Sequence, residues 1–263
     1  MTTHACPKTL CEMAVHVLTT ADGREKTALS HQYAAMWFAA REAGQVLDIG
    51  RADPPMRPAR PDKPALLDPR DVPKRKPGSP QGRIALLHAV AHIELNAVDL
   101  HWDIIPRFAD TPMPLGWYDD WIKAADEESK HFNLMCDCLE ELGSFYGDLS
   151  AHAGMWRAAE DTVDDIMGRL AVVPMVLEAR GLDVTPGMID IFKRANLTSA
   201  VEALEIIYAE EVGHVAYGSK WFNLYAEQSA IMADSASQGI VRRQGFWDQE
   251  RPNLRESLAH LVV

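Results

Sequence analysis

The sequence predicts an all-α fold in which two N-terminal helices and a proline-rich arm precede a four-helix bundle. Apolar residues recur three and four positions apart along most of the chain, as in amphipathic helices, and no segment shows strand-like alternation. Nine of the sixteen prolines fall between residues 53 and 80, a density that excludes a helix interior or a central strand. We therefore expect four parts. N-terminal helices at residues 1–50 pack on the bundle, the arm follows at 51–80, the bundle occupies 81–228, and a tail at 229–263 packs on the outside of the bundle.

The segments on either side of residue 20 predict the two N-terminal helices, at residues 8–17 and 24–43. Apolar residues at helical spacing are Leu10, Met13, Ala14 and Val17 in the first, and Tyr33, Met36, Trp37 and Ala40 in the second. The arm that follows carries eight Lys or Arg against four Asp. We expect it to be an extended, solvated and partly polyproline-II connection.

Four long helical patterns follow the arm, and turn-rich segments at residues 112–116, 143–147 and 181–187 separate them. Each pattern carries an apolar seam of the kind that packs inside a helical bundle. The third pattern also contains Pro174. Because proline removes a backbone donor, we expect a kink one turn before Glu178.

Composition narrows the class of protein. A chain of 263 residues suits one main core, and no apolar run approaches the roughly 18 residues of a membrane span. The net charge of -12 argues against broad nucleic-acid binding. No secretory signal is recognisable, so we expect a soluble, cytoplasmic protein with no membrane partner and with reduced cysteines.

Two Glu-x-x-His motifs, at residues 128–131 and 211–214, lie on the seams of the second and fourth patterns. Residues three apart share a helix face, so each pair can bind one metal ion. A lone glutamate lies on the seam of the helix before each motif, 34 residues ahead of the first and 33 ahead of the second. Four such helices would bring together Glu94, Glu128, His131, Glu178, Glu211 and His214.

The residue types indicate the metal. Isolated buried carboxylates cost several kcal/mol each, whereas four of them neutralise two divalent ions. Imidazole and carboxylate together suit iron or manganese. We predict two iron ions, with manganese or a mixed manganese and iron pair as alternatives.

Several neighbours of these six residues remain open. Glu127 and Glu210 lie one position off the seam; they are solvated or support the ligands, and a helix register shifted by one would make them the rival ligands. For His88, His92 and His101, a structural role is favoured over hydrogen bonding to the metal ligands. Tyr208, Tyr217 and Arg180 are possible hydrogen-bond donors to the ligands.

The ligand pattern resembles the ferritin-like superfamily, which includes rubrerythrins, ribonucleotide reductase small subunits and the tRNA hydroxylase that acts on modified adenosine. A bacterial ferritin-like family, labelled only as a domain of unknown function, is the closer likeness. It rests on GSPQGR at 78–83, AHIEL at 91–95, DEESKHF at 126–132 and EARGLDVTP at 178–186, and runs from about residue 10 to 225.

The resemblance implies a ferritin-like four-helix bundle in which Glu128 and Glu211 bridge the two metals. Glu94 and His131 would then bind one metal, and Glu178 and His214 the other. All six positions are filled, so the resemblance does not indicate an inactivated relative.

These observations favour a di-iron oxidoreductase that activates dioxygen or peroxide to oxidise an unidentified small-molecule or RNA substrate. The chain has no Cys-x-x-Cys rubredoxin module, so an external electron donor is expected. A homodimer is expected by analogy.

The alternatives to the di-iron oxidoreductase are a ferroxidase or peroxide-scavenging protein of rubrerythrin type, and a metal-stabilised, non-catalytic protein whose basic arm binds an acidic partner or RNA. A pocket that reaches the metals would favour catalysis, and a closed core the structural role.

Overall fold

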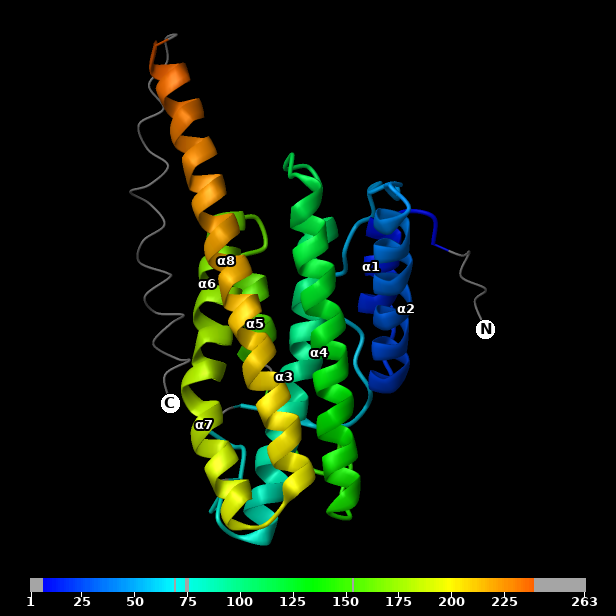
Figure 1. Cartoon of the computed structure of the whole chain (residues 1–263), viewed down its shortest axis with the longest axis vertical. Helices are drawn as coiled ribbons and strands as arrows, with labels where there is room; N and C mark the ends of the chain where they lie inside the picture. Colours follow the sequence, from blue (N-terminus) through cyan, green and yellow to red (C-terminus); the bar gives the residue numbers. More distant parts are fainter. Residues whose placement is uncertain (1–6, 69, 74–75, 153, 239–263) are drawn as a thin grey trace.

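The computed structural model describes residues 7–68, 70–73, 76–152 and 154–238, and it is mostly helical, which confirms the all-α prediction. Its elements are α1 Leu10–Thr19, α2 Gly23–Glu42, β1 Leu66–Leu67, α3 Pro80–Arg107, α4 Leu115–Glu141, β2 Ala151–His152, α5 Gly154–Asp161, α6 Ile166–Val172, the π-helix η1 Val173–Glu178, α7 Ala179–Arg194 and α8 Thr198–Gln238. The long helices α3 and α4 pack side by side, α7 packs on α8, and α4 also contacts α8 (Figure 1).

Local signals start several helices where the sequence places them. Thr9 and Glu12 form a reciprocal capping box at the start of α1, and Asp22 caps α2. Ser79 caps α3 and is followed by Pro80, whose missing N–H costs nothing at this position. The helices predicted at residues 8–17 and 24–43 are therefore confirmed within two residues.

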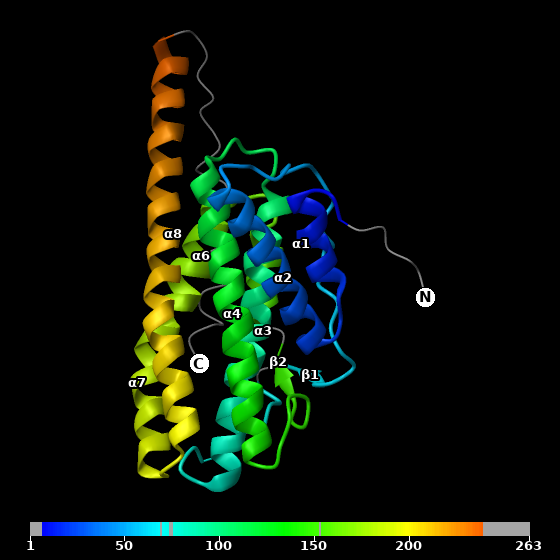
Figure 2. The same ribbon diagram turned by 45° about the vertical axis from the view of Figure 1, so that its right-hand side comes forward.

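A tryptophan-rich core joins the N-terminal helices to the long ones. Trp37 of α2, Trp102 of α3 and Trp121 of α4 are all fully buried in one apolar cluster, to which α1 also contributes. Nε1 of Trp102 donates a hydrogen bond of 2.8 Å to Oγ of Ser30, which fixes α2 against α3. In Figure 2, α1 and α2 lie against the α3–α4 side of the molecule.

The prediction of a turn at residues 181–187 is wrong. The helices α6, η1 and α7 follow one another without a break, and α7 covers this segment. The chain turns instead after α7, where Asn196 has a φ of 56°. Pro186 lies inside α7, and the hydroxyl of Thr185 donates a 2.7 Å hydrogen bond to the carbonyl of Gly181. Phe192 is fully buried in an apolar cluster shared with α8, so tertiary packing outweighs the local turn signal.

Pro174 does distort its helix, because it lies at the start of the π-helix η1. The distortion ends at Glu178, which is 4% exposed and faces the core. On the opposite side, Gly218 of α8 makes room for the proline ring, since a Cβ at Gly218 would lie 2.6 Å from Cβ of Pro174. The helix α8 also continues ten residues beyond the expected boundary at 228, and the rest of the predicted tail, residues 239–263, lies outside the described residues.

The first part of the proline-rich arm is bound to the helices, which corrects the expectation of a solvated connection there, whereas most of the described residues from 65 to 80 are exposed as expected. Its residues 55–60 accept or donate hydrogen bonds to side chains or backbone of α1, α2, α3 and α5. Nη2 of Arg60, for example, lies 2.6 Å from Oδ1 of Asn96. The arm also supplies β1, which pairs in parallel with β2 over two residues (Figure 2).

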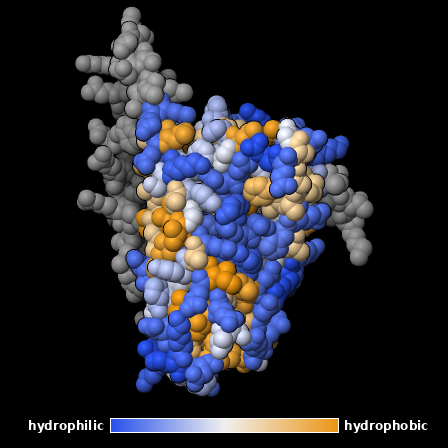
Figure 3. Space-filling view, in the orientation of Figure 1, coloured by the Kyte–Doolittle hydropathy of each residue, from blue (hydrophilic) through white to orange (hydrophobic). Residues whose placement is uncertain are grey.

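The surface is predominantly hydrophilic on the face shown in Figure 3, with apolar patches that interrupt it on the side of α7 and α8. Exposed apolar side chains of η1, α7 and α8 are Val176, Val184, Ile206 and Val212. Across the residues described, every helix is too short or too polar to cross a lipid bilayer. Cys11, Cys136 and Cys138 are free thiols.

Candidate metal centre

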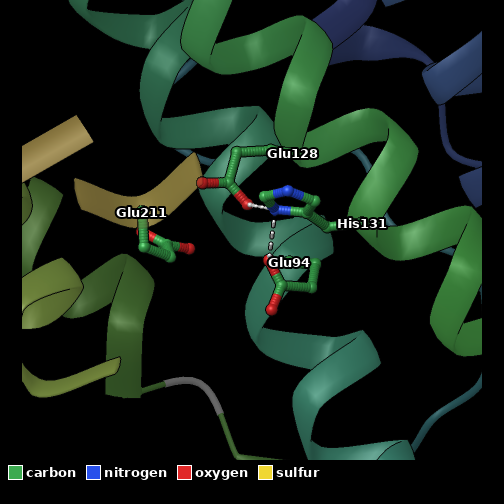
Figure 4. A group of neighbouring side chains, drawn as sticks. All are labelled: Glu94, Glu128, His131 and Glu211. Carbon is green, nitrogen blue, oxygen red and sulfur yellow. Dashed lines mark hydrogen bonds and ion pairs between the residues drawn. The ribbon is translucent and has the colours of Figure 1, made fainter. Parts of the chain in front are cut away.

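The six predicted ligands converge from four elements. Glu94 comes from α3, the first Glu-x-x-His pair from α4, Glu178 from the end of η1 and the second pair from α8. All six side chains are buried, with at most 5% of each residue exposed. Figure 4 shows the part of this group formed by Glu94, Glu128, His131 and Glu211.

The first imidazole lies between carboxylates of two helices. Nδ1 of His131 is 3.3 Å from Oε2 of Glu128 and 3.5 Å from Oε2 of Glu94 (Figure 4). Each of the four residues drawn there offers a ligand atom, and these atoms all lie within 4.8 Å of one another. One metal ion between them would have three carboxylates and one imidazole within reach.

The second imidazole repeats this arrangement on α8. Nδ1 of His214 lies 2.9 Å from Oε1 of Glu128 and 3.3 Å from Oε2 of Glu211. The two oxygens of Glu128 therefore face different histidines, Oε2 toward His131 and Oε1 toward His214. A carboxylate placed in this way can be shared by two ions.

The two off-seam glutamates bind the far side of the imidazoles. Nε2 of His131 lies 2.8 Å from Oε2 of Glu210, and Nε2 of His214 lies 3.1 Å from Oε2 of Glu127. Each of these two glutamates thus directly precedes one Glu-x-x-His motif and contacts the histidine of the other motif. The structure places Glu128 and Glu211, rather than Glu127 and Glu210, at the centre of the cluster.

Lysines complete these outer contacts. Nζ of Lys130 is 2.5 Å from Oε1 of Glu210, and Nζ of Lys123 is 2.7 Å from Oε1 of Glu127. The Glu210 and Glu127 side chains are 25% and 14% exposed. The outer nitrogen of each imidazole is therefore separated from solvent by a single carboxylate.

Electrostatics favour protons in the centre when it holds no metal. Burial, with the neighbouring Glu128, raises the pKa of Glu94 well above its usual range, and burial with Glu211 does the same for the pKa of Glu178. Burial alone would also raise the pKa of Glu128, but the adjacent His214 and His131 hold it well below its usual range. The carboxylates in turn raise the pKa of both imidazoles against the effect of burial, so metal binding must displace protons.

Several polar atoms in the centre have no hydrogen-bond partner among the described residues, although they are buried. They are Oε1 of Glu178 and both ring nitrogens of His101, together with Oε2 of Glu94 and Oε1 of Glu128, which face His131 and His214 as ion pairs but do not meet hydrogen-bond geometry. Buried polar groups are nearly always satisfied, so such a cluster of exceptions fits residues that await an ion. Carboxylate and imidazole donors suit iron, manganese or zinc.

His101 is part of this cluster, although the sequence favoured a structural role for it. Its Nε2 lies 3.8 Å from Oε1 of Glu178, and it forms a second group of possible ligands with Glu128 and Glu178. Burial lowers the pKa of His101 to about 4, so the ring is neutral at physiological pH. Glu128 opposes this shift, as does the Ala97 carbonyl, which does not meet hydrogen-bond geometry. The feature of the sequence that could have identified His101 as part of the cluster is its position two turns after Glu94 on the same seam.

The other neighbours lie farther out. His88 and His92 hold the segment at residues 146–152 by hydrogen bonds to Gly147, Tyr146 and the carbonyl of His152. The Tyr217 ring lies beside His214, with centroids 6.3 Å apart. Tyr208 and Arg180, which the sequence offered as donors, have exposed side chains.

Comparison with known proteins places the chain in a family. The family model described as "Protein of unknown function (DUF455)" matches residues 19–256. An uncharacterized protein of Haemophilus influenzae is 43% identical over 180 residues, which cover 66% of this chain and 62% of that protein. The chain thus spans less than two thirds of this relative's length, and no solved structure matches. The match over most of its length shows that the chain belongs to the DUF455 family.

Proposed function

We propose that this protein is a ferritin-like, carboxylate-bridged di-iron oxidoreductase. The observation that carries the proposal is the position of Glu128, whose two oxygens face the imidazoles of His131 and His214. Two Glu-x-x-His motifs and two lone glutamates around a shared carboxylate are the ligand set of di-iron carboxylate proteins. We assign Glu94 and His131 to one ion and Glu178 and His214 to the other, with Glu128 and Glu211 shared.

Bound iron would supply the electrons that reduce dioxygen or peroxide, and a substrate and an external electron donor would complete the reaction. The protein's own contribution is to hold the ligands and exclude water. The residues one turn before Glu128 and Glu211 are Ala124 and Ile207, and both are buried. Such an apolar surround strengthens electrostatic interactions inside the site and protects reactive species from water.

The outer glutamates set the direction of the imidazoles. With Glu210 on Nε2 of His131 and Glu127 on Nε2 of His214, each Nδ1 is directed toward the centre. A carboxylate on the far nitrogen fixes the tautomer and makes the imidazole a stronger ligand. These glutamates are themselves partly exposed, so each links an imidazole of the centre to solvent.

A second candidate is a metal-stabilised protein without catalysis. The low exposure of all six ligands, at most 5%, favours this alternative, since a substrate larger than dioxygen needs an opening. The basic arm gives this non-catalytic alternative weaker support, because Arg60 bonds to Asn96 and Arg57 pairs with Glu160. These contacts occupy two of the eight cations that the arm offers to an acidic partner or RNA.

Anaerobic iron loading tests the proposal. We expect about two iron ions per chain, followed by rapid oxygen consumption when air is readmitted. Fewer than about one ion per chain after loading would reject the di-iron centre. If two ions bind but neither oxygen nor peroxide is consumed, with or without cell metabolites and a reductant, the centre is structural. Turnover of oxygen or peroxide without added metabolites would favour the ferroxidase or scavenging alternative.

A further inference from the structure

We propose that His101 is a seventh ligand of the centre, which binds the metal ion on the Glu178 side. The inference rests on the di-metal centre proposed above and deepens it. The two halves of the centre would then differ, because one ion would have a single imidazole and the other would have two, from His214 and His101.

The first argument is the position of the His101 side chain. It is 1% exposed, and its Nε2 lies 3.8 Å from Oε1 of Glu178. This distance is too long for a hydrogen bond. Two atoms that each lie about 2.0 to 2.2 Å from one metal ion are separated by roughly 3 to 4 Å, so the spacing suits two ligands of the same ion.

The second argument is a contrast with other histidines of the same helix. Both ring nitrogens of His92 are bonded, to the hydroxyl of Tyr146 at 2.9 Å and to the carbonyl of His152 at 3.0 Å. Nε2 of His88 accepts a 2.9 Å hydrogen bond from the amide of Gly147. Neither nitrogen of His101 has a hydrogen-bond partner in the described chain. A histidine with a purely structural role would be satisfied as the other two are.

The third argument is the grouping of ligand atoms. His101, Glu128 and Glu178 form one group whose ligand atoms lie within 4.8 Å of one another, and Glu94, Glu128, His131 and Glu211 form another. Glu128 is the residue common to both groups. This is the arrangement expected of two ion positions joined by a shared carboxylate, with His101 in the position farther from Glu94.

Packing holds the imidazole of His101 in place. Its ring stacks on Trp121 with centroids 5.6 Å apart and an angle of 18° between the planes. Trp117 packs edge-on against Trp121, so the indole cannot easily move. A ligand whose ring is fixed before the ion arrives loses little freedom on binding.

The test compares His101→Phe with the wild type and with His92→Phe. Phenylalanine retains the stacking on Trp121 but cannot bind metal, and the control removes a hydrogen-bonded histidine of α3. Each metal-free protein is titrated anaerobically with Fe²⁺ and, separately, with Co²⁺, whose visible absorption reports ligand type and number. Circular dichroism and thermal melting establish folding, and His101→Gln replaces the Phe variant if that variant does not fold.

We expect the wild type and His92→Phe to bind about two ions and His101→Phe to lose one ion, or to bind it at least about 10-fold more weakly, with an altered Co²⁺ spectrum. Added imidazole should restore the second ion in His101→Gly. Two ions bound by His101→Phe with unchanged affinity and spectrum would overturn the proposal for His101 alone. Failure of the wild type to bind even one ion would instead reject the di-metal centre itself.

Discussion

Nε2 of His131 lies 2.8 Å from Oε2 of Glu210, a residue 79 positions later in the chain that directly precedes the predicted ligand Glu211. The second motif mirrors this contact, because His214 meets Glu127, the neighbour of Glu128. Adjacent glutamates therefore have different tasks. One faces the centre, and the other orients the imidazole of the opposite helix.

This division predicts different outcomes for neighbouring substitutions. Glu128→Ala and Glu211→Ala should abolish binding of both ions, because the shared carboxylates are lost. Glu127→Ala and Glu210→Ala should retain the stoichiometry but weaken binding about 10- to 100-fold, since the imidazoles lose their outer partners. Metal analysis and anaerobic titration measure both effects. Retention of metal by Glu128→Ala together with its loss in Glu127→Ala would show that the ligand register is shifted by one residue.

Replacing Glu178 by glutamine should stabilise the metal-free protein while it impairs metal binding. Glu178 is 4% exposed, its Oε1 has no hydrogen-bond partner within the described segments, and burial raises its pKa. Because of this raised pKa, Glu178 must take up a proton when the metal-free chain folds, whereas a neutral amide of the same shape does not, which predicts a gain of about 1 to 3 kcal/mol in the free energy of unfolding.

Urea unfolding in a chelator measures this gain, and melting with and without Fe²⁺ measures the metal effect. Glu202→Gln, at an exposed position of α8, is the control and should change neither quantity. A metal-free Glu178→Gln protein that is less stable than the wild type would contradict the view that this carboxylate is retained for a ligand.

Gly218→Ala should destabilise the protein and weaken metal binding. The new Cβ would lie 2.6 Å from Cβ and Cγ of Pro174, so η1 must move away from α8. Overpacking of this kind costs about 1 to 3 kcal/mol, and the movement displaces Glu178 one turn later. Thermal melting and iron titration report the two effects.

Gly213→Ala is the matched control on the same helix. Its Cβ would lie 3.7 Å from the Tyr217 hydroxyl, an ordinary contact, and alanine favours a helix interior by about 0.8 to 1 kcal/mol over glycine. This variant should be as stable as the wild type or more stable. Equal destabilisation by both substitutions would show that the proximity of Pro174 to α8 is not the cause.

Acid should destabilise the metal-free protein partly through His92. Burial lowers the pKa of His92 from 6.5 to about 3, so between these values the unfolded chain binds a proton that the folded protein does not. The free energy of unfolding therefore falls as the pH drops from about 6.5 toward 3, with a slope of up to about 1.4 kcal/mol per pH unit from this group. His92→Gln should give a shallower slope.

Urea unfolding in a chelator at several pH values from 7 to 4 measures this slope. His31→Gln removes a partly exposed imidazole that pairs with Asp126, and it controls for the loss of a histidine as such. An unchanged slope in His92→Gln would assign the acid sensitivity to other groups.

Local sequence patterns were sufficient for much of the fold. The boundaries of α1 and α2 follow from apolar spacing and from caps such as Thr9 and Asp22, and all six predicted ligands meet in the core. Such features depend on the helical repeat, which any short segment contains. The turn at residues 181–187 could not be excluded in this way, because the burial of Phe192 against α8 overrides the local signal there.

The sequence by itself determined which carboxylates and imidazoles share a helix face, since a spacing of three residues sets that geometry within one turn. Only the tertiary structure decided how they pair between helices. The contacts of Glu210 with His131 and of Glu127 with His214, and the unsatisfied nitrogens of His101, arise between segments far apart in the chain. Their physical cause is burial, because hydrogen bonds and charges inside the protein depend on which groups remain when water is excluded.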